Sequence, residues 1–206
     1  DMSTFLDSQL EQIRSQVGER SVFLLASGGV DSTVAAKLIG MALGSDRLKL
    51  LHVDNGLMRK EESVGVLRMF NDLGLGENLH FIDATDDFLG DMAGLVEPEA
   101  KRHSIGATFV NVFEREARRL DIEDHLLGQG TIYPDTIETG GTKRSHTIKT
   151  HHNRVPIIEE MLAQGKVIEP LADLYKVEVR ALGRQLGIPD HALDRHPFPG
   201  PGLGVR

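Results

Sequence analysis

The sequence predicts an α/β protein: a doubly wound parallel sheet of about five strands with helices on both faces. Short apolar runs alternate with longer segments of helical periodicity, which is the pattern of strands joined by crossover helices. The first apolar run ends in a glycine-rich turn at residues 27–33 that leads directly into a helical segment. In such sheets ligands bind beyond the carboxyl ends of the strands, so functional residues are expected there.

The composition is that of an ordinary soluble globular protein. The 206 residues suffice for one domain with a buried core, and 40% are hydrophobic and 26% charged. The net charge of -8 disfavours binding to nucleic acid, and no apolar run approaches the roughly 20 residues of a membrane span. Cysteine is absent, which removes disulfides, thiolate metal sites and a cysteine nucleophile. We therefore expect a cytoplasmic protein without nucleic-acid or membrane partners.

Five short apolar runs are expected to form the strands. The first two are mostly apolar, as in strands of a parallel sheet buried on both faces. In chain order the expected strands are residues 22–26, 48–53, 79–82, 124–127 and 167–168.

The helices are expected between these strands, where apolar residues recur at helical spacing. Gly18 ends the first helix, Pro98 lies in the first turn of the longest one, and Gly187 with Pro189 ends the last. Residues 139–160 contain a glycine pair and no periodicity, which predicts a mobile loop. In chain order the expected helices are residues 4–17, 34–43, 59–73, 97–120 and 174–186.

The turn at residues 27–33 has the properties of a phosphate-binding loop. Backbone N–H groups and the helix dipole attract an anion at such a turn, and Gly28 and Gly29 let the main chain approach it closely. It is not a Walker A loop, because no lysine precedes Lys37, and its adjacent glycines do not fit the dinucleotide fingerprint. The alternative is an ordinary tight turn in which Asp31 stabilises the start of the helix.

Two further strand ends carry polar residues and are expected at the same edge of the sheet. The sequence 54–56, Asp-Asn-Gly, could contact the adenine or ribose of a nucleotide, or could be a turn made of turn-forming residues. Residues 130–135, with Glu138, include Asp135, whose carboxylate could ligate Mg²⁺ beside a bound nucleotide. The alternative for this second segment is a solvated acidic loop.

Cations near the start of the longest predicted helix also point to an anionic ligand. Lys101 and Arg102 lie where the helix dipole disfavours positive charge, which favours contact with an external anion such as a substrate phosphate. The alternative is pairing with Glu97 or Glu99. Lys176 and Arg180, on the last helix, are interpreted as a solvated face.

The loop at 139–160 is rich in polar side chains. Lys149 is expected to reach a polyphosphate from a lid over the site. A three-histidine metal site and a polar loop with incidental histidines are the alternatives. The side chains concerned are His146, Lys149, His151, His152 and Asn153. The alternating prolines and glycines of residues 195–206 are typical of a stiff linker, so we expect a further domain beyond them.

Taken together, several stretches resemble the synthetase part of the GMP synthetases. This family is one of the N-type ATP pyrophosphatases, which have the adenine nucleotide alpha hydrolase-like fold. The narrowest motifs are His-His-Asn at 151–153 and His-Pro-Phe-Pro-Gly-Pro-Gly at 196–202. The other matching stretches are residues 27–32, 53–56, 99–102, 105–106, 129–135, 148–150 and 169–171.

The resemblance implies a reaction: ATP and Mg²⁺ activate the C2 oxygen of xanthosine 5′-monophosphate (XMP) as an adenylyl ester, and ammonia then displaces AMP to give GMP. It implies one ATP pyrophosphatase domain over residues 1–206, with an N-terminal helix at 1–20, the lid loop at 139–160 and a segment at 195–206 that leads to a dimerisation domain.

The resemblance also implies roles for single residues. Asp31 and Lys149 are the expected catalytic residues, Arg102 and Lys101 the expected contacts to XMP, and Asp31 and Asp135 the expected Mg²⁺ ligands. The expected ATP contacts are Ser27, Gly28, Gly29, Val30, Asp31, Ser32, Thr33, Val53, Phe109 and Gly130.

The sequence departs from the family in three respects. Residues 1–206 include no glutaminase domain and no cysteine, so we expect ammonia to come from solution or from a glutaminase partner. The resemblance implies a dimerisation domain through which the family forms homodimers, and residues 1–206 do not include it. Many members have Gly-Gly-Leu-Pro after the His-His-Asn motif, where Arg154, Val155 and Pro156 stand here. The competing hypotheses are another ligase with the same loop, such as NAD synthetase or a tRNA-thiolating enzyme, and a non-catalytic ATP-binding module.

Overall fold

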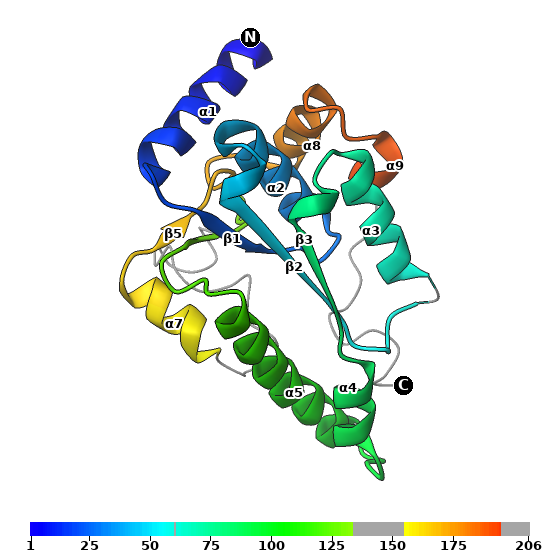
Figure 1. The fold of residues 1–206 in the computed structure, drawn as a ribbon. Helices are drawn as coiled ribbons and strands as arrows, with labels where there is room; N and C mark the ends of the chain where they lie inside the picture. Colours follow the sequence, from blue (N-terminus) through cyan, green and yellow to red (C-terminus); the bar gives the residue numbers. More distant parts are fainter. Residues whose placement is uncertain (60, 134–154, 195–206) are drawn as a thin grey trace.

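The protein folds around a sheet of five parallel strands (Figure 1). The computed structural model describes residues 1–59, 61–133 and 155–194. The strands lie in the order β3-β2-β1-β4-β5, so the strand order reverses at the central strand β1. This arrangement confirms the predicted doubly wound sheet. The strands are β1 (Val22–Leu25), β2 (Leu48–Asp54), β3 (Leu79–Asp83), β4 (Leu126–Gly128) and β5 (Val167–Ile168).

Helices cover both faces of the sheet, as predicted (Figure 1). One face is covered by α1 (Met2–Val17), α2 (Val30–Leu43), α3 (Glu62–Asp72), α8 (Lys176–Gln185) and α9 (Asp190–Leu193). The other face is covered by α4 (Thr85–Met92), α5 (Pro98–Arg119) and α7 (Pro156–Ala163). Two short 3₁₀ helices, η1 (Ser45–Arg47) and η2 (Gly76–Asn78), precede β2 and β3.

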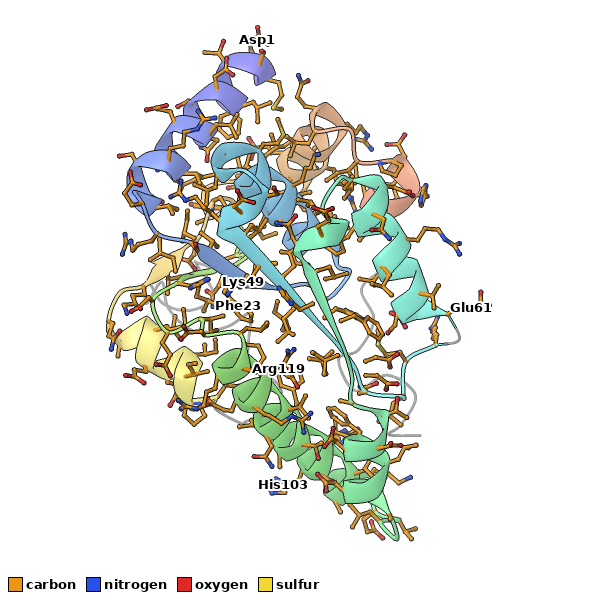
Figure 2. The ribbon with its side chains drawn as sticks, viewed as in Figure 1. Asp1, Phe23, Lys49, Glu61, His103 and Arg119 are labelled. Atoms are coloured by element: carbon orange, nitrogen blue, oxygen red, sulfur yellow. The ribbon has the colours of Figure 1, made fainter. Side chains whose placement is uncertain are left out.

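The central strand explains why the sequence shows an unbroken apolar run there. Val22 and Leu24 are buried in the cluster beneath α1, α2 and α8, whereas Phe23 points to the opposite face. Figure 2 shows Phe23 on the side of the sheet that faces α5, where its ring meets Phe113 edge to face at 5.6 Å. Alternate residues of a strand point to opposite faces, so a strand covered on both faces must be apolar at every position.

Some predicted boundaries are wrong. The first helix begins at Met2, two residues earlier than predicted, because the carboxylate of Asp1 accepts from the Ser3 amide and caps the helix. The third helix begins at Glu62, three residues later than predicted. The predicted loop at 139–160 ends in α7, because Pro156 suits the first turn of a helix. Residues 139–154 of that loop and the segment 195–206 lie outside the described residues.

The short helices α4, α7 and α9 do not appear among the helices expected from the sequence. Each is four to eight residues long, which is too short to show helical periodicity. Among the helices of the described ranges, none is long and apolar enough to cross a membrane.

Candidate active site

The predicted phosphate loop lies between β1 and α2, at the carboxyl edge of the central strand. Gly28 has a φ of 79°, a left-handed conformation that favours glycine. Gly29 is the N-cap of α2, and no side chain caps this helix end. A helix start without a side-chain cap presents its first N–H groups to an anion.

Hydroxyl groups hold the loop in shape and face one another across it. The Oγ atoms of Ser27 and Ser32 lie 3.2 Å apart, and the hydroxyl of Thr33 donates to the Gly29 carbonyl at 2.7 Å. Thr33 is buried beneath the loop, whereas Ser27 is exposed. The loop thus combines fixed backbone geometry with hydroxyl donors that are open to a ligand.

Gly130, in the loop after β4, packs directly against the phosphate loop. A Cβ atom on Gly130 would lie 2.9 Å from both the Asp31 carbonyl carbon and the Ser32 amide nitrogen. Real Cβ atoms do not approach backbone so closely, so only glycine fits at this position. The loops after β1 and β4 therefore meet where the strand order reverses, which is the usual ligand site of an open α/β sheet.

Lys176, interpreted from the sequence as part of a solvated face, reaches this site. Its Nζ donates to Oδ1 of Asp31 at 2.6 Å, and the two side chains are 39% and 27% exposed. Lys176 is the first residue of α8, where the helix dipole disfavours a cation. Lys176 therefore has the feature by which the sequence indicates Lys101 and Arg102, a positive charge near the start of a helix. Arg180, one turn later, instead contacts the Leu193 carbonyl at 3.2 Å and Asp194.

The two residues predicted to contact adenine lie on the same face of the sheet. Val53 is at the end of β2 and Phe109 is on α5, and both are half-buried against the apolar cluster of that face. The ring of Phe109 packs against Phe113 with centroids 5.9 Å apart. The end of β2 and helix α5 thus lie together beside the carboxyl edge of the sheet.

The predicted contacts to XMP lie farther out along α5. Arg102 is exposed and forms an ion pair with Glu99, the alternative weighed from the sequence. Figure 2 shows the neighbouring residue His103 on the part of α5 that extends beyond the sheet. Lys101 is half-buried on the same turn. Neither side chain belongs to the group formed by the loop, Gly130 and Lys176.

Side chains within the turn at residues 54–56 accept hydrogen bonds from backbone amides two residues further on. The Asp54 carboxylate accepts from the Gly56 amide, and the Asn55 side chain accepts from the Leu57 amide, each at 2.8 Å. Gly56 has a φ of 72°. Residues 54–56 therefore form a turn that is closed by their own side chains.

Comparison with solved structures supports the fold. An NMN synthetase from Francisella tularensis superposes with a TM-score of 0.64 over 100% of this chain and 77% of its own, at 14% identity. An NH₃-dependent NAD synthetase from Campylobacter jejuni superposes with a TM-score of 0.61 over 97% of this chain and 79% of its own, at 17% identity. No model of a protein family matches the chain. The parallel sheet and these neighbours define the adenine nucleotide alpha hydrolase-like fold.

Sequence comparison finds close similarity to GMP synthases. The chain is 52% identical over 211 aligned positions to a GMP synthase [glutamine-hydrolyzing] of Rhizobium johnstonii, and 50% identical over 206 to a putative GMP synthase of Bacteroides thetaiotaomicron. Over its whole length the chain is similar to one part of these GMP synthases. Each alignment includes 100% of this chain but only 39% and 46% of the relatives, so the chain spans less than half of their length.

Proposed function

We propose that this chain carries the ATP pyrophosphatase step of a GMP synthase: adenylylation of XMP with release of pyrophosphate, followed by amination to GMP. The observation that carries the proposal is the identity of 50 to 52% over the whole chain to GMP synthases. The NMN and NAD synthetases share the fold at 14 to 17% identity. They therefore support the fold of this chain, but they give no reason to assign it NMN or NAD chemistry.

The phosphate loop supplies the site for the β- and γ-phosphates of ATP. The first N–H groups of α2 and the hydroxyls of Ser27 and Ser32 would bind the phosphate oxygens, and Lys176 would add a positive charge beside them. Val53 and Phe109 offer apolar surface on which the adenine ring would rest. The C2 oxygen of XMP is a poor leaving group by itself. Once it is adenylylated it leaves as AMP when ammonia attacks.

The described residues fit a magnesium site only in part. No group of three or more His, Asp or Glu side chains lies together within residues 1–59, 61–133 and 155–194. Asp31 is the carboxylate beside the loop, so it would hold Mg²⁺ together with phosphate oxygens and water, a common arrangement for this ion. Bound there, Mg²⁺ would neutralise charge that builds up on the pyrophosphate as it leaves. Asp135, the second predicted ligand, lies outside the described residues.

The remaining roles follow the predictions from the sequence. Arg102 would exchange Glu99 for the phosphate of XMP, with Lys101 beside it. Lys149, outside the described residues, would reach the polyphosphate from the loop that contains it. Ammonia would come from solution or from a glutaminase domain or subunit, and a dimerisation domain would complete the XMP site.

The proposal is tested by pyrophosphate release in the full-length protein with ATP, Mg²⁺ and ammonium, and with either XMP or deamido-NAD as acceptor. Release only with XMP, together with formation of GMP, supports the proposal. Release only with deamido-NAD would show an NAD synthetase instead. Tight ATP binding without release from either acceptor would show a non-catalytic ATP-binding module.

Lys176→Met is expected to lower kcat/KM for ATP by about 10- to 100-fold, because one cation beside the phosphates contributes about 1.4 to 3 kcal/mol. Methionine keeps the length of the side chain and removes its charge. The measurement is pyrophosphate release at varied ATP and fixed XMP. Arg180→Met is the matched control, because Arg180 lies one turn later on α8 and contacts Leu193 and Asp194. Equal losses in the two variants would contradict a role for Lys176 at the phosphate site.

A further inference from the structure

A buried histidine lies directly behind the phosphate loop. His52 belongs to β2 and is only 2% exposed. Its Nδ1 lies 2.7 Å from the carbonyl oxygen of Ala26, the residue that precedes the loop. Its Nε2 lies 3.1 Å from Oγ of Ser63 on α3. The ring thus connects α3 and β2 to the peptide unit from which the loop begins.

The partners fix which ring nitrogen carries the proton. A carbonyl oxygen only accepts, so Nδ1 must donate to Ala26, and in a neutral ring Nε2 then accepts from the Ser63 hydroxyl. Ser63 Oγ also lies 3.1 Å from Sδ of Met58, but a thioether is much the weaker acceptor. Both nitrogens therefore have the partner that their protonation state requires.

The surroundings keep the ring neutral. Burial lowers the pKa of His52, although the Ala26 carbonyl and the charges of Asp54 and Glu62 act in the opposite direction. The ring of Phe81 lies beside it at a centroid distance of 5.6 Å and adds apolar surface. At neutral pH the ring therefore carries one proton, on the nitrogen that faces Ala26.

This contact determines how the loop begins. The Ala26 amide donates to the Leu51 carbonyl at 2.8 Å, so Ala26 is held to β2 both through its N–H and through its C=O. In a trans peptide the C=O and the following N–H point in opposite directions. A hydrogen bond that directs Ala26 C=O toward β2 therefore directs the Ser27 N–H to the other side of the strand, where β4 and its loop lie.

We propose that His52 is a positioning residue for the phosphate loop: its Nδ1–H fixes the Ala26–Ser27 peptide and so the geometry in which the loop receives pyrophosphate. The inference rests on the proposed function, because it assumes that the loop binds the phosphates of ATP. It does not depend on which acceptor the enzyme uses.

The test compares two amide variants that replace different ring nitrogens. His52→Asn places its NH₂ group near the position of Nδ1 and keeps a donor for Ala26. His52→Gln places its amide near Nε2, toward Ser63, and loses that donor. Ser63→Ala removes the Nε2 partner and leaves the Ala26 contact. The readout is calorimetric binding of inorganic pyrophosphate with Mg²⁺, and of ATP, to the full-length protein.

We expect His52→Gln to weaken both ligands by roughly tenfold, and His52→Asn and Ser63→Ala to weaken them by less than about threefold, since a single buried hydrogen bond is at stake. Equal weakening by the Asn and Gln variants, or none in either, would overturn the proposal. The readout is phosphate binding. A failure of XMP to act as substrate would therefore contradict the proposed function and leave the proposal for His52 unaffected.

A measurement on the unmodified protein covers the case in which His52→Gln does not fold. Nitrogen NMR of His52 should show the Nδ1–H tautomer, and its proton resonance should shift when Mg²⁺ and pyrophosphate are added. The Nε2–H tautomer, or a ring resonance unmoved at saturating pyrophosphate, would show a buried histidine that only fills the core.

Discussion

Asp31→Ala is expected to reduce pyrophosphate release by about 1000-fold or more, because it removes the carboxylate beside the phosphates and the Mg²⁺ they carry. The fold should survive. Asp31 lies in the first turn of α2 and its side chain is 27% exposed, outside the core. Losing its interactions with the helix dipole and with Lys176 costs about 1 to 3 kcal/mol. Release of pyrophosphate from ATP and XMP, and urea unfolding, measure the two effects separately.

Asp86→Ala is the matched control for this substitution. Asp86 also lies in the first turn of a helix, α4, and is exposed, but it is far along the chain from the phosphate loop. Its replacement should cost up to about 1 kcal/mol and leave pyrophosphate release unchanged. Ordinary kinetics in Asp31→Ala would mean that Asp31 only stabilises the start of α2, the alternative weighed from the sequence.

The strands were predictable because a sheet covered on both faces leaves an unbroken apolar run in the sequence. β1 and β2 were found to within one residue at each end for this reason. The order of the strands was not predictable, because it depends on pairings between distant segments. α4 was missed because Phe88 is its only fully buried residue, and one buried position cannot show a period.

The phosphate loop was predictable from local sequence, and its partner Lys176 was not. The ion pair between Asp31 and Lys176 joins residues 145 positions apart, and neither segment contains a sign of the other. Arg102 and Lys176 both lie near the start of a helix, where the dipole disfavours a cation. In the structure Arg102 has Glu99 as its partner three residues away, whereas Lys176 finds a carboxylate on another helix.

His52 shows a second limit of reading a strand from its composition. Within the run 48–53 it interrupts an apolar pattern, and the sequence contains no indication of which polar groups surround it. Only the fold brings the Ala26 carbonyl and the Ser63 hydroxyl to its two nitrogens. A buried polar group needs partners, so a histidine inside an apolar strand predicts that partners exist without naming them.

Gly130→Ala is expected to reduce kcat/KM for ATP by about 100-fold, because a displacement of about 1 Å in a binding loop has effects of this size. The added methyl group would lie 2.9 Å from the backbone of Asp31 and Ser32. Backbone cannot rotate aside as a side chain can, so the first turn of α2 or the loop after β4 must move. Stability should fall by about 1 to 3 kcal/mol, the usual cost of overpacking.

Gly128→Ala separates the loss of geometry from the loss of stability. Gly128 lies two residues earlier on β4, and its added methyl group would meet side-chain ends of Val22, Ile39 and Leu24 at 3.1 to 3.2 Å. These contacts strain the core without touching the phosphate loop, so this variant should lose comparable stability and keep its KM for ATP. If both variants lost activity in proportion to their stability, the contact between Gly130 and the loop would be a matter of packing only. A loss of activity confined to Gly130→Ala would show that the loop after β4 sets the geometry of the loop after β1.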